Sequence, residues 1–341
     1  MVFITGGNGL IGSYTTRLLL ERGYPVRLLR RPGSRLDWLS DVASRIEWVE
    51  GDVLDPTLLL DAIQPGDWVI HAAALVSFQP SQREKMFKVN VEGTANVVNA
   101  CLQKHAGKLC FVSSVAALGR SKKNPLIDET TPWEASEFNT AYAHSKYLAE
   151  LEVWRGVAEG LSAVVVNPSV VLGPADWQRS STQLFKYAWD EHLFYPAGTV
   201  NYVDVRDVAE AIYLLLRSNI ISEKFILNAG NITHRELLSG MAVGFGKNPP
   251  TFEAKPWMAA LGWRLEWLRS AITGKLPLLT RETTRSTYFN YHYSNDKVKN
   301  AIHFSFRSLQ DTLRWACGAL AGKYGGQSPS GQASVTYMTP K

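Results

Sequence analysis

Apolar runs alternate with segments of helical periodicity along the first half of the chain. The apolar runs predict buried strands at Val2–Thr5, Pro25–Arg30, Ile46–Val49, Trp68–Ala74, Leu109–Ser113 and Ala163–Asn167. Between them, apolar residues recur at helical spacing up to Gly23 and near residues 56–63, 81–105 and 142–158. This alternation predicts the α/β class, with a Rossmann-type, doubly wound parallel sheet covered on both faces. Ligands are then expected at the carboxyl ends of the strands.

The pattern changes after Pro168, where aromatic residues become denser and Pro and Gly interrupt the periodicity. We expect a dinucleotide-binding domain at 1–168, with a returning segment at about 200–228. A smaller C-terminal substrate-binding domain is expected from 169–199 and 229–322, and residues 323–341, rich in Gly, Ser and Pro, predict a loose tail. The aromatic residues have two interpretations, an apolar substrate pocket or an ordinary core.

Composition indicates a soluble globular protein, with 45% hydrophobic and 20% charged residues in 341. The formal charge is +5, but the basic residues are scattered, so no nucleic-acid partner is expected. The three cysteines, Cys101, Cys110 and Cys317, lack metal-ligand spacing, and we expect reduced thiols and no metal. A strand starting at residue 2 leaves no room for a signal peptide, and no apolar run could cross a bilayer, so a cytoplasmic location is expected. The expected assembly is a monomer or a homodimer.

The segment from Pro256 to Gly274 leaves two interpretations open. Its tryptophans and leucines align at helical spacing on one broad apolar face. A helix lying on a membrane surface has this pattern, and so does a lid helix packed on the substrate domain, which the few charges favour. We therefore expect no membrane partner.

The stretch "ITGGNGLIG" at residues 4–12 follows the first strand and opens the first helical pattern. Glycines in a strand–turn–helix setting let a pyrophosphate approach backbone N–H groups at the positive end of a helix. Two registers fit this stretch, one beginning at Gly6 and one at Gly7. Either one predicts dinucleotide binding.

Tyr142 and Lys146 are four residues apart, on one face of a predicted helix. Free tyrosine titrates near ~10, so a nearby cation makes its proton acidic enough for transfer near neutrality. The same spacing recurs at Tyr293–Lys297 and Tyr337–Lys341. Only Tyr142 follows a strand that ends in serines, Ser113 and Ser114, whose hydroxyls could hold a substrate oxygen.

With these motifs in place, the chain resembles the extended short-chain dehydrogenases/reductases, the NAD-dependent epimerase/dehydratase family. Within it, the chain is similar to the dihydroflavonol reductase and 3β-hydroxysteroid dehydrogenase branch. The matching segments extend over residues 1 to about 230 in the family's order: Thr5–Gly12, Gly51–Val53, His71–Ala74, Val89–Thr94, Val112–Ser114, Tyr142–Lys146, Asn167–Pro174 and Tyr202–Ala209. The resemblance implies the register that begins at Gly6.

The resemblance also implies roles for individual residues. Tyr142 would be the general acid/base, Lys146 would lower its pKa and bind the nicotinamide ribose, and Ser114 would bind the reacting oxygen. Asp52 and Val53 would contact adenine. The remaining implied cofactor contacts are Gly6, Gly9, Leu10, Ile11, Gly12, Ala72, Ala73, Ala74, Pro168 and Val170. His71 is either functional or a hydrogen-bonded structural residue.

The end of the second strand predicts NADP(H) as the cofactor, with NAD as the alternative. An acidic residue there would accept hydrogen bonds from the ribose 2′-hydroxyl, whereas arginine binds a 2′-phosphate. No acid lies between Glu21 and Asp37, and the strand ends in Arg30 and Arg31. Arg30 is the expected phosphate contact because it stands at the strand end.

The predicted function is that of an NADP(H)-dependent oxidoreductase that reduces a ketone or aldehyde, or oxidises the alcohol, of an apolar or aromatic small molecule. Dehydration is disfavoured because Val115 and Ala116 replace the Asp-Glu pair that family dehydratases carry. A nucleotide-sugar epimerase with bound NAD is the alternative, which Asn167 and Leu172 weaken. A non-catalytic dinucleotide sensor is a further alternative, disfavoured because Ser114, Tyr142 and Lys146 are all present.

Overall fold

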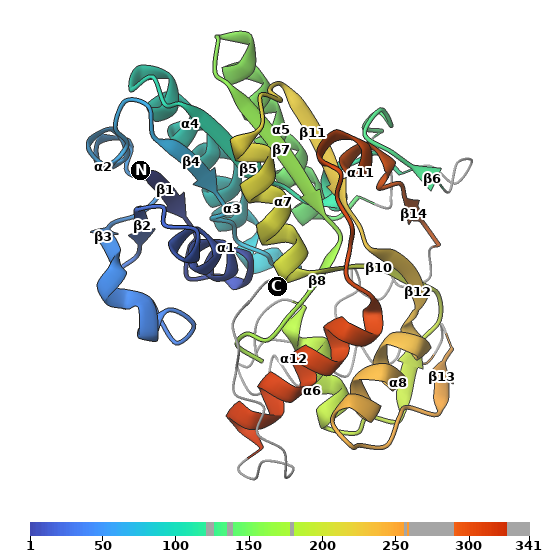
Figure 1. Ribbon diagram of the computed structural model, residues 1–341. Helices are drawn as coiled ribbons and strands as arrows, with labels where there is room; N and C mark the ends of the chain where they lie inside the picture. The colour runs from blue at the N-terminus through green and yellow to red at the C-terminus, as the bar shows by residue number, and fades with distance from the viewer. Residues whose placement is uncertain (121–125, 135–138, 178–180, 256–257, 259–289, 326–341) are drawn as a thin grey trace.

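A seven-stranded parallel sheet forms the centre of the molecule in the computed structural model (Figure 1), which describes residues 1–341 except 121–125, 135–138, 178–180, 256–257, 259–289 and 326–341. The sheet order is β11-β7-β5-β4-β1-β2-β3. Its strands are β1 (Val2–Thr5), β2 (Val26–Arg30), β3 (Ile46–Glu50), β4 (Trp68–His71), β5 (Lys108–Val112), β7 (Ala163–Pro168) and β11 (Glu223–Leu227). The order reverses direction at β1, as in the doubly wound dinucleotide-binding fold, so the predicted fold class is confirmed.

Helices cover both faces of this sheet. One apolar core joins its strands to α1 (Leu10–Glu21) and α7 (Val205–Arg217). The other core joins them to α2 (Pro56–Ala62), α4 (Gly93–Gln103) and α5 (Ala141–Ala158). Both faces of each central strand are therefore buried, which explains why these strands read as continuous apolar runs.

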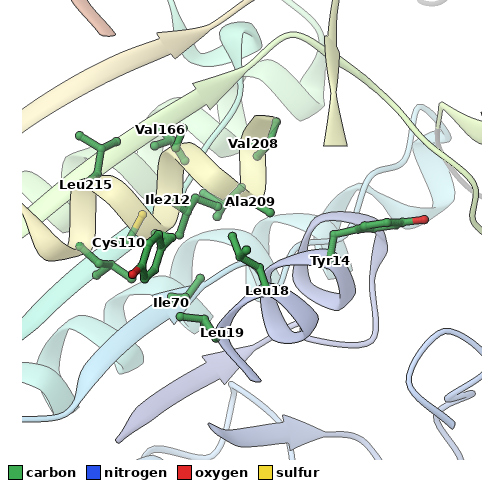
Figure 2. Close-up of a cluster of buried hydrophobic side chains, with 14 of the residues drawn as sticks. Tyr14, Leu18, Leu19, Ile70, Cys110, Val166, Val208, Ala209, Ile212 and Leu215 are labelled. Carbon is green, nitrogen blue, oxygen red and sulfur yellow. The ribbon is translucent and has the colours of Figure 1, made fainter. Parts of the chain in front are cut away.

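Figure 2 shows the first core, where Leu18 and Leu19 of α1 lie beside Ala209 and Ile212 of α7 above the strands. Leu19 and Ile212 are completely buried. Burial of such a side chain stabilises the fold by roughly 1.5–3 kcal/mol. This packing holds α1, the helix that follows the glycine loop, against the sheet.

A second lobe follows β7, built on a three-stranded sheet in the order β12-β10-β8. The strands are β8 (Val170–Leu172), β10 (Thr199–Asp204) and β12 (Gly230–Thr233). The lobe's core also draws on α6 (Thr182–Trp189), α8 (His234–Gly244) and α12 (Leu309–Tyr324), which lie together in Figure 1. The predicted domain boundaries stay a prediction, although α12 includes Lys323 and Tyr324, which the sequence assigns to the tail.

Several of the aromatic residues of this lobe lie in its core. Trp177 packs on Trp189 and Phe245 with ring centroids 5.4 and 6.2 Å apart, and Phe185 is fully buried. Phe194, in β9 (Phe194–Pro196), is exposed and lies beside Phe252 of β13 (Phe252–Ala254). For Trp177 and Phe185, which are buried, the core interpretation is correct.

Other boundaries differ in detail. β4 ends at His71 rather than Ala74, because the chain leaves the sheet after the Ala72 N–H bonds to Thr5 O. The expected helix at 81–105 is a succession of η2 (Pro80–Gln82), α3 (Arg83–Phe87), a π-helical turn (Lys88–Glu92) and α4. The short elements are η1 (Ser40–Arg45), η4 (Val115–Ala117), β6 (Leu126–Ile127), β14 (His292–Tyr293) and α11 (Asp296–Ile302).

The segment 256–274 lies outside the described residues except for Met258, so neither interpretation of it is tested. In the part of the chain that the structure describes, no helix has the length and apolar character needed to span a membrane.

Candidate active site

The glycine loop joins β1 to α1 at the carboxyl edge of the sheet. Gly6 has φ +71°, and a Cβ atom there would lie 2.5 Å from the backbone nitrogen of Ala73. A Cβ atom on Gly12 would overlap the Gly6 carbonyl oxygen, whereas Gly9 is exposed and caps α1. A Cβ atom on Gly6 or Gly12 would thus overlap backbone, and one on Gly9 would lie 3.2 Å from the Gly6 carbonyl oxygen. This cradle fits a pyrophosphate and supports the register that begins at Gly6.

The loop after β4 lies against the glycine loop. Ala72 and Ala73 are partly buried and Ala74 is exposed, so small side chains line this edge. Ahead of them, His71 is fully buried, with Nδ1 2.6 Å from the Thr5 hydroxyl and Nε2 3.0 Å from that of Thr94. Burial lowers the pKa of His71 to about 3, and the charge of Lys146 adds to this effect. His71 is therefore neutral near pH 7, and its ring joins the Thr5 and Thr94 hydroxyls.

The two serines after β5 have different partners. Ser113 is buried and donates its hydroxyl hydrogen to Glu150 Oε1 at 2.5 Å. Ser114 is partly exposed, and its Oγ accepts the Ala116 N–H at 3.1 Å to cap η4. The Ser114 side chain also lies near the Tyr142 phenol, since it influences the pKa of that phenol. Ser114 is thus the serine that can meet a substrate oxygen.

Tyr142 lies in the first turn of α5, which Thr140 caps by accepting the Ala143 N–H at 3.1 Å. The ring is partly buried, with the edge of Phe78 against it at a centroid distance of 6.1 Å. Burial raises the pKa of Tyr142 to about 12, and the nearby Ser114 side chain opposes that rise. The phenol is therefore protonated over the physiological range and can donate its proton.

Lys146 follows one turn later and is 1% exposed. Its Nζ donates to the carbonyl oxygen of Val112 at 3.0 Å and lies 4.3 Å from the centroid of the Phe111 ring. Burial lowers the pKa of Lys146 to about 8, against the opposing charge of Glu150. The sequence predicts a lowered pKa for Tyr142, but in this structure burial of the phenol outweighs any such effect of Lys146.

Asn90 is a site residue that sequence reasoning left without a role. It is 1% exposed, in the π-helical turn, and its side chain bonds to both backbone groups of Leu75 at 2.8 and 3.0 Å. Its amide also donates to the Ser145 hydroxyl, which donates to Tyr142 O. Asn90 thus ties the loop after β4 to the turn that carries Tyr142. Its place in the Val89–Thr94 motif is the signal that could have found it.

The other two Tyr-Lys pairs lie elsewhere. Tyr293 is buried in β14 within a small cluster that includes Ile127 and Ile226. Tyr337 lies outside the described residues. Within the part of the chain that the structure describes, Tyr142–Lys146 is the only one of these pairs that lies beside a strand-end serine.

The expected adenosine end lies at the tips of β2 and β3. Arg30 Nη2 is 3.5 Å from Glu50 Oε2, and the guanidinium lies 5.1 Å from the centroid of the Trp48 ring. Arg31 is exposed. Asp52 Oδ1 accepts the Leu54 N–H at 3.1 Å, and Val53 is buried against Gly93. Asp52 and Val53 thus shape the turn below this end of the site.

The remaining predicted contacts line the middle of the edge. Leu10 and Ile11, partly buried, open α1, and Pro168 ends β7, two residues before the partly buried Val170. None of these positions is tested for cofactor contact, and all of them stay predictions. No cluster of His, Cys, Asp and Glu within the described ranges could hold a metal ion.

Comparison with known proteins identifies relatives across most of the chain. The sequence pattern of the NAD dependent epimerase/dehydratase family matches residues 2–230. A putative dihydroflavonol 4-reductase of Synechocystis sp. is 30% identical, over 91% of this chain and 92% of its own. Cinnamoyl-CoA reductase 1 of Petunia hybrida is 33% identical, over 69% of this chain and 74% of its own.

Among solved structures, the NAD complex of UDP-glucose 4-epimerase from Thermus thermophilus superposes with a TM-score of 0.74. It is 24% identical and covers 94% of this chain and 99% of its own. At this identity the likeness concerns the fold alone.

Proposed function

Because the chain belongs to the NAD dependent epimerase/dehydratase family and is an NAD(P)-dependent oxidoreductase, we propose that it uses NADPH to reduce the carbonyl group of an apolar or aromatic small molecule. The single observation that carries the proposal is the hydrogen bond of 3.0 Å from the buried Lys146 Nζ to Val112 O, which holds the α5 turn of Tyr142 and Lys146 against the end of β5, where Ser114 follows. Two hydroxyl donors then converge on one substrate oxygen.

In the proposed reduction, Ser114 donates a hydrogen bond to the carbonyl oxygen and orients it toward Tyr142. Tyr142 gives its proton to that oxygen as negative charge develops. Its pKa of about 12 keeps the proton available at neutral pH. When bound, NADPH supplies the hydride. In the reverse direction Tyr142 would accept the alcohol proton.

Lys146 has two proposed tasks. Its charge favours the phenolate that Tyr142 becomes after the transfer, because an ammonium in a buried site acts at short range through a low dielectric. Within the described residues its Nζ donates one hydrogen bond, to Val112 O, so its other N–H groups can hold a ribose hydroxyl. Arg30, whose Nε is buried and has no hydrogen-bond partner among the described residues, is proposed to bind the 2′-phosphate.

An apolar or aromatic substrate is supported by the surroundings of Tyr142. Phe78 packs against the Tyr142 ring, and the alanines at 72–74, beside the glycine loop, add small and uncharged side chains to the same edge of the sheet. The names of two relatives, a dihydroflavonol 4-reductase and a cinnamoyl-CoA reductase, point to flat aromatic substrates. These names describe the relatives, and for this chain they indicate the substrate class to test first.

The test is oxidation of NADPH with a panel of aromatic ketones and aldehydes, comparing the wild type with Tyr142→Phe. We expect Tyr142→Phe to remove turnover while NADPH still binds, because the change deletes one hydroxyl. Tyr293→Phe is the matched control, since it deletes the same atom from a buried tyrosine that also precedes a lysine by four residues. Equal losses in the two variants would refute the assignment of the catalytic helix, and stronger use of NADH would refute the cofactor preference.

A further inference from the structure

The tips of β2 and β3 carry a carboxylate that the strand sequence alone does not place there. Arg30 and Glu50 are direct partners in the parallel pairing of these strands, 20 residues apart in the chain. Their side chains form an ion pair of 3.5 Å, with the Glu50 side chain 55% and the Arg30 side chain 30% exposed. The adenosine end of the site therefore holds one positive and one negative group side by side.

Trp48 completes the arrangement from the same face of β3. Its ring lies under the guanidinium of Arg30, and its indole N–H donates to Ala43 O at 3.0 Å, which fixes the ring plane. Arg30 Nε is buried and has no hydrogen-bond partner among the described residues. The guanidinium is thus held in place by a ring and a single ion pair, with an unused donor.

We propose that Glu50 sets the cofactor selectivity of this site by competing with a ribose 2′-phosphate for the guanidinium that Trp48 holds at the end of β2. The inference rests on the proposed NADP(H) preference and extends it to a residue of the neighbouring strand. A 2′-phosphate that binds Arg30 must displace the Glu50 carboxylate or accept a like charge beside it. Glu50 therefore weakens phosphate binding, whereas Arg30 provides it.

The competition between Glu50 and a 2′-phosphate should be measurable as a change in the dissociation constant of the phosphate ligand. An exposed ion pair contributes modestly in water, and removal of the nearby like charge adds to the gain. We expect Glu50→Gln to tighten binding of a 2′-phosphate about threefold to tenfold. Binding of a ligand without that phosphate stays within about twofold, because Gln keeps the shape of the side chain.

The experiment is isothermal titration of the full chain with adenosine 2′,5′-bisphosphate and with 5′-AMP, in the wild type and in Glu50→Gln. The quantity compared is the ratio of the two dissociation constants, and the 5′-AMP value reports whether the adenosine site is intact. Glu47→Gln is the control, because Glu47 lies on the same strand, has a similar exposure of 51%, and pairs with Arg27 instead. Glu47→Gln should leave the ratio within twofold of the wild type.

The double variant Arg30→Gln/Glu50→Gln separates competition from simple repulsion. If Glu50 acts by occupying Arg30, its replacement changes the ratio much less once Arg30 is gone. A ratio in Glu50→Gln that equals the wild-type or Glu47→Gln ratio would overturn the inference, as would a full effect without Arg30. The wild-type ratio alone tests the NADP(H) preference, so the two ideas fail separately.

Discussion

Ser113 and Glu150 form a buried hydrogen bond of 2.5 Å that turns the first of two adjacent serines away from the substrate side. Glu150 Oε1 also accepts the Asn167 amide at 2.5 Å, and that amide donates to Ser114 O at 3.0 Å. The carboxyl group of Glu150 thus ties the ends of β5 and β7 to α5. Burial raises its pKa, while its two donors oppose the rise.

Glu150→Ala is expected to lower the free energy of unfolding by about 2–3 kcal/mol, because it leaves the Ser113 hydroxyl and the Asn167 amide buried without this acceptor. Urea denaturation measures the change. Glu152→Ala is the control on the same helix, where Glu152 pairs with Arg155 at the surface, and it should cost less than about 1 kcal/mol. Equal losses would show that Glu150 has no special structural role.

The pH profile of reduction should follow Lys146. Its pKa is about 8, so its charge is present below that pH and disappears above it, whereas Tyr142, with a pKa of about 12, stays protonated throughout. We expect kcat/KM for reduction to fall by up to roughly tenfold per pH unit above pH 8. Steady-state rates from pH 6 to pH 10 measure this, and a flat profile to pH 10 would contradict the role of the charge.

The lowered pKa of Lys146 should make the free energy of unfolding rise with pH, whereas the rate of reduction should fall. A lysine that titrates near 8 in the fold and 10.5 when unfolded binds more protons in the unfolded chain between these values. Its contribution therefore makes the fold more stable as pH rises from about 8 to 10.5. Lys146→Met, which removes the titration, should flatten this part of the unfolding free-energy profile compared with the wild type.

Gly6→Ala should lower the free energy of unfolding by more than the left-handed backbone conformation of Gly6 alone would cost. A Cβ atom on Gly6, at φ +71°, would meet the backbone of Ala72 and Ala73, whereas one on Gly66, at φ +78°, would have no neighbouring atom within 4 Å. Gly66→Ala should therefore cost only the left-handed conformation, about 1–2 kcal/mol. Gly6→Ala should cost more and weaken cofactor binding, as thermal unfolding and fluorescence titration would show. Similar losses of stability in Gly6→Ala and Gly66→Ala would show that the close approach of the Ala72 and Ala73 backbone to Gly6 adds no cost.

Asn90→Ala is expected to lower kcat more than it raises KM, because it frees the turn at Tyr142 from the loop at Leu75 without removing a substrate contact. Steady-state kinetics with one aromatic ketone give the two constants. Asn96→Ala is the comparison, because Asn96 lies in α4 and its side-chain amide donates to Val53 O instead of to Ser145. A rise in KM with unchanged kcat would assign Asn90 to binding instead.

The sequence by itself determined the features that depend on neighbouring residues. Apolar strands and helical periodicity predict the doubly wound sheet, because a strand buried on both faces must be apolar throughout. The glycine loop and the Tyr142–Lys146 spacing are equally local, since one turn of helix brings those two side chains to one face.

Only the tertiary structure decided which of the matching residues meet. Successive side chains after β5 point to opposite sides, so Ser113 meets Glu150 while Ser114 does not. The packing of α5 on the end of β5 brings Tyr142 near Ser114. The aromatic residues after Pro168 could have lined a pocket or filled a core, and Trp177 and Phe185 fill the core because apolar residues of α8 and α12 join the same cluster. Glu50 reaches Arg30 only because β3 pairs in register with β2. Such contacts depend on strand register and helix packing over long sequence separations, which a linear pattern does not contain.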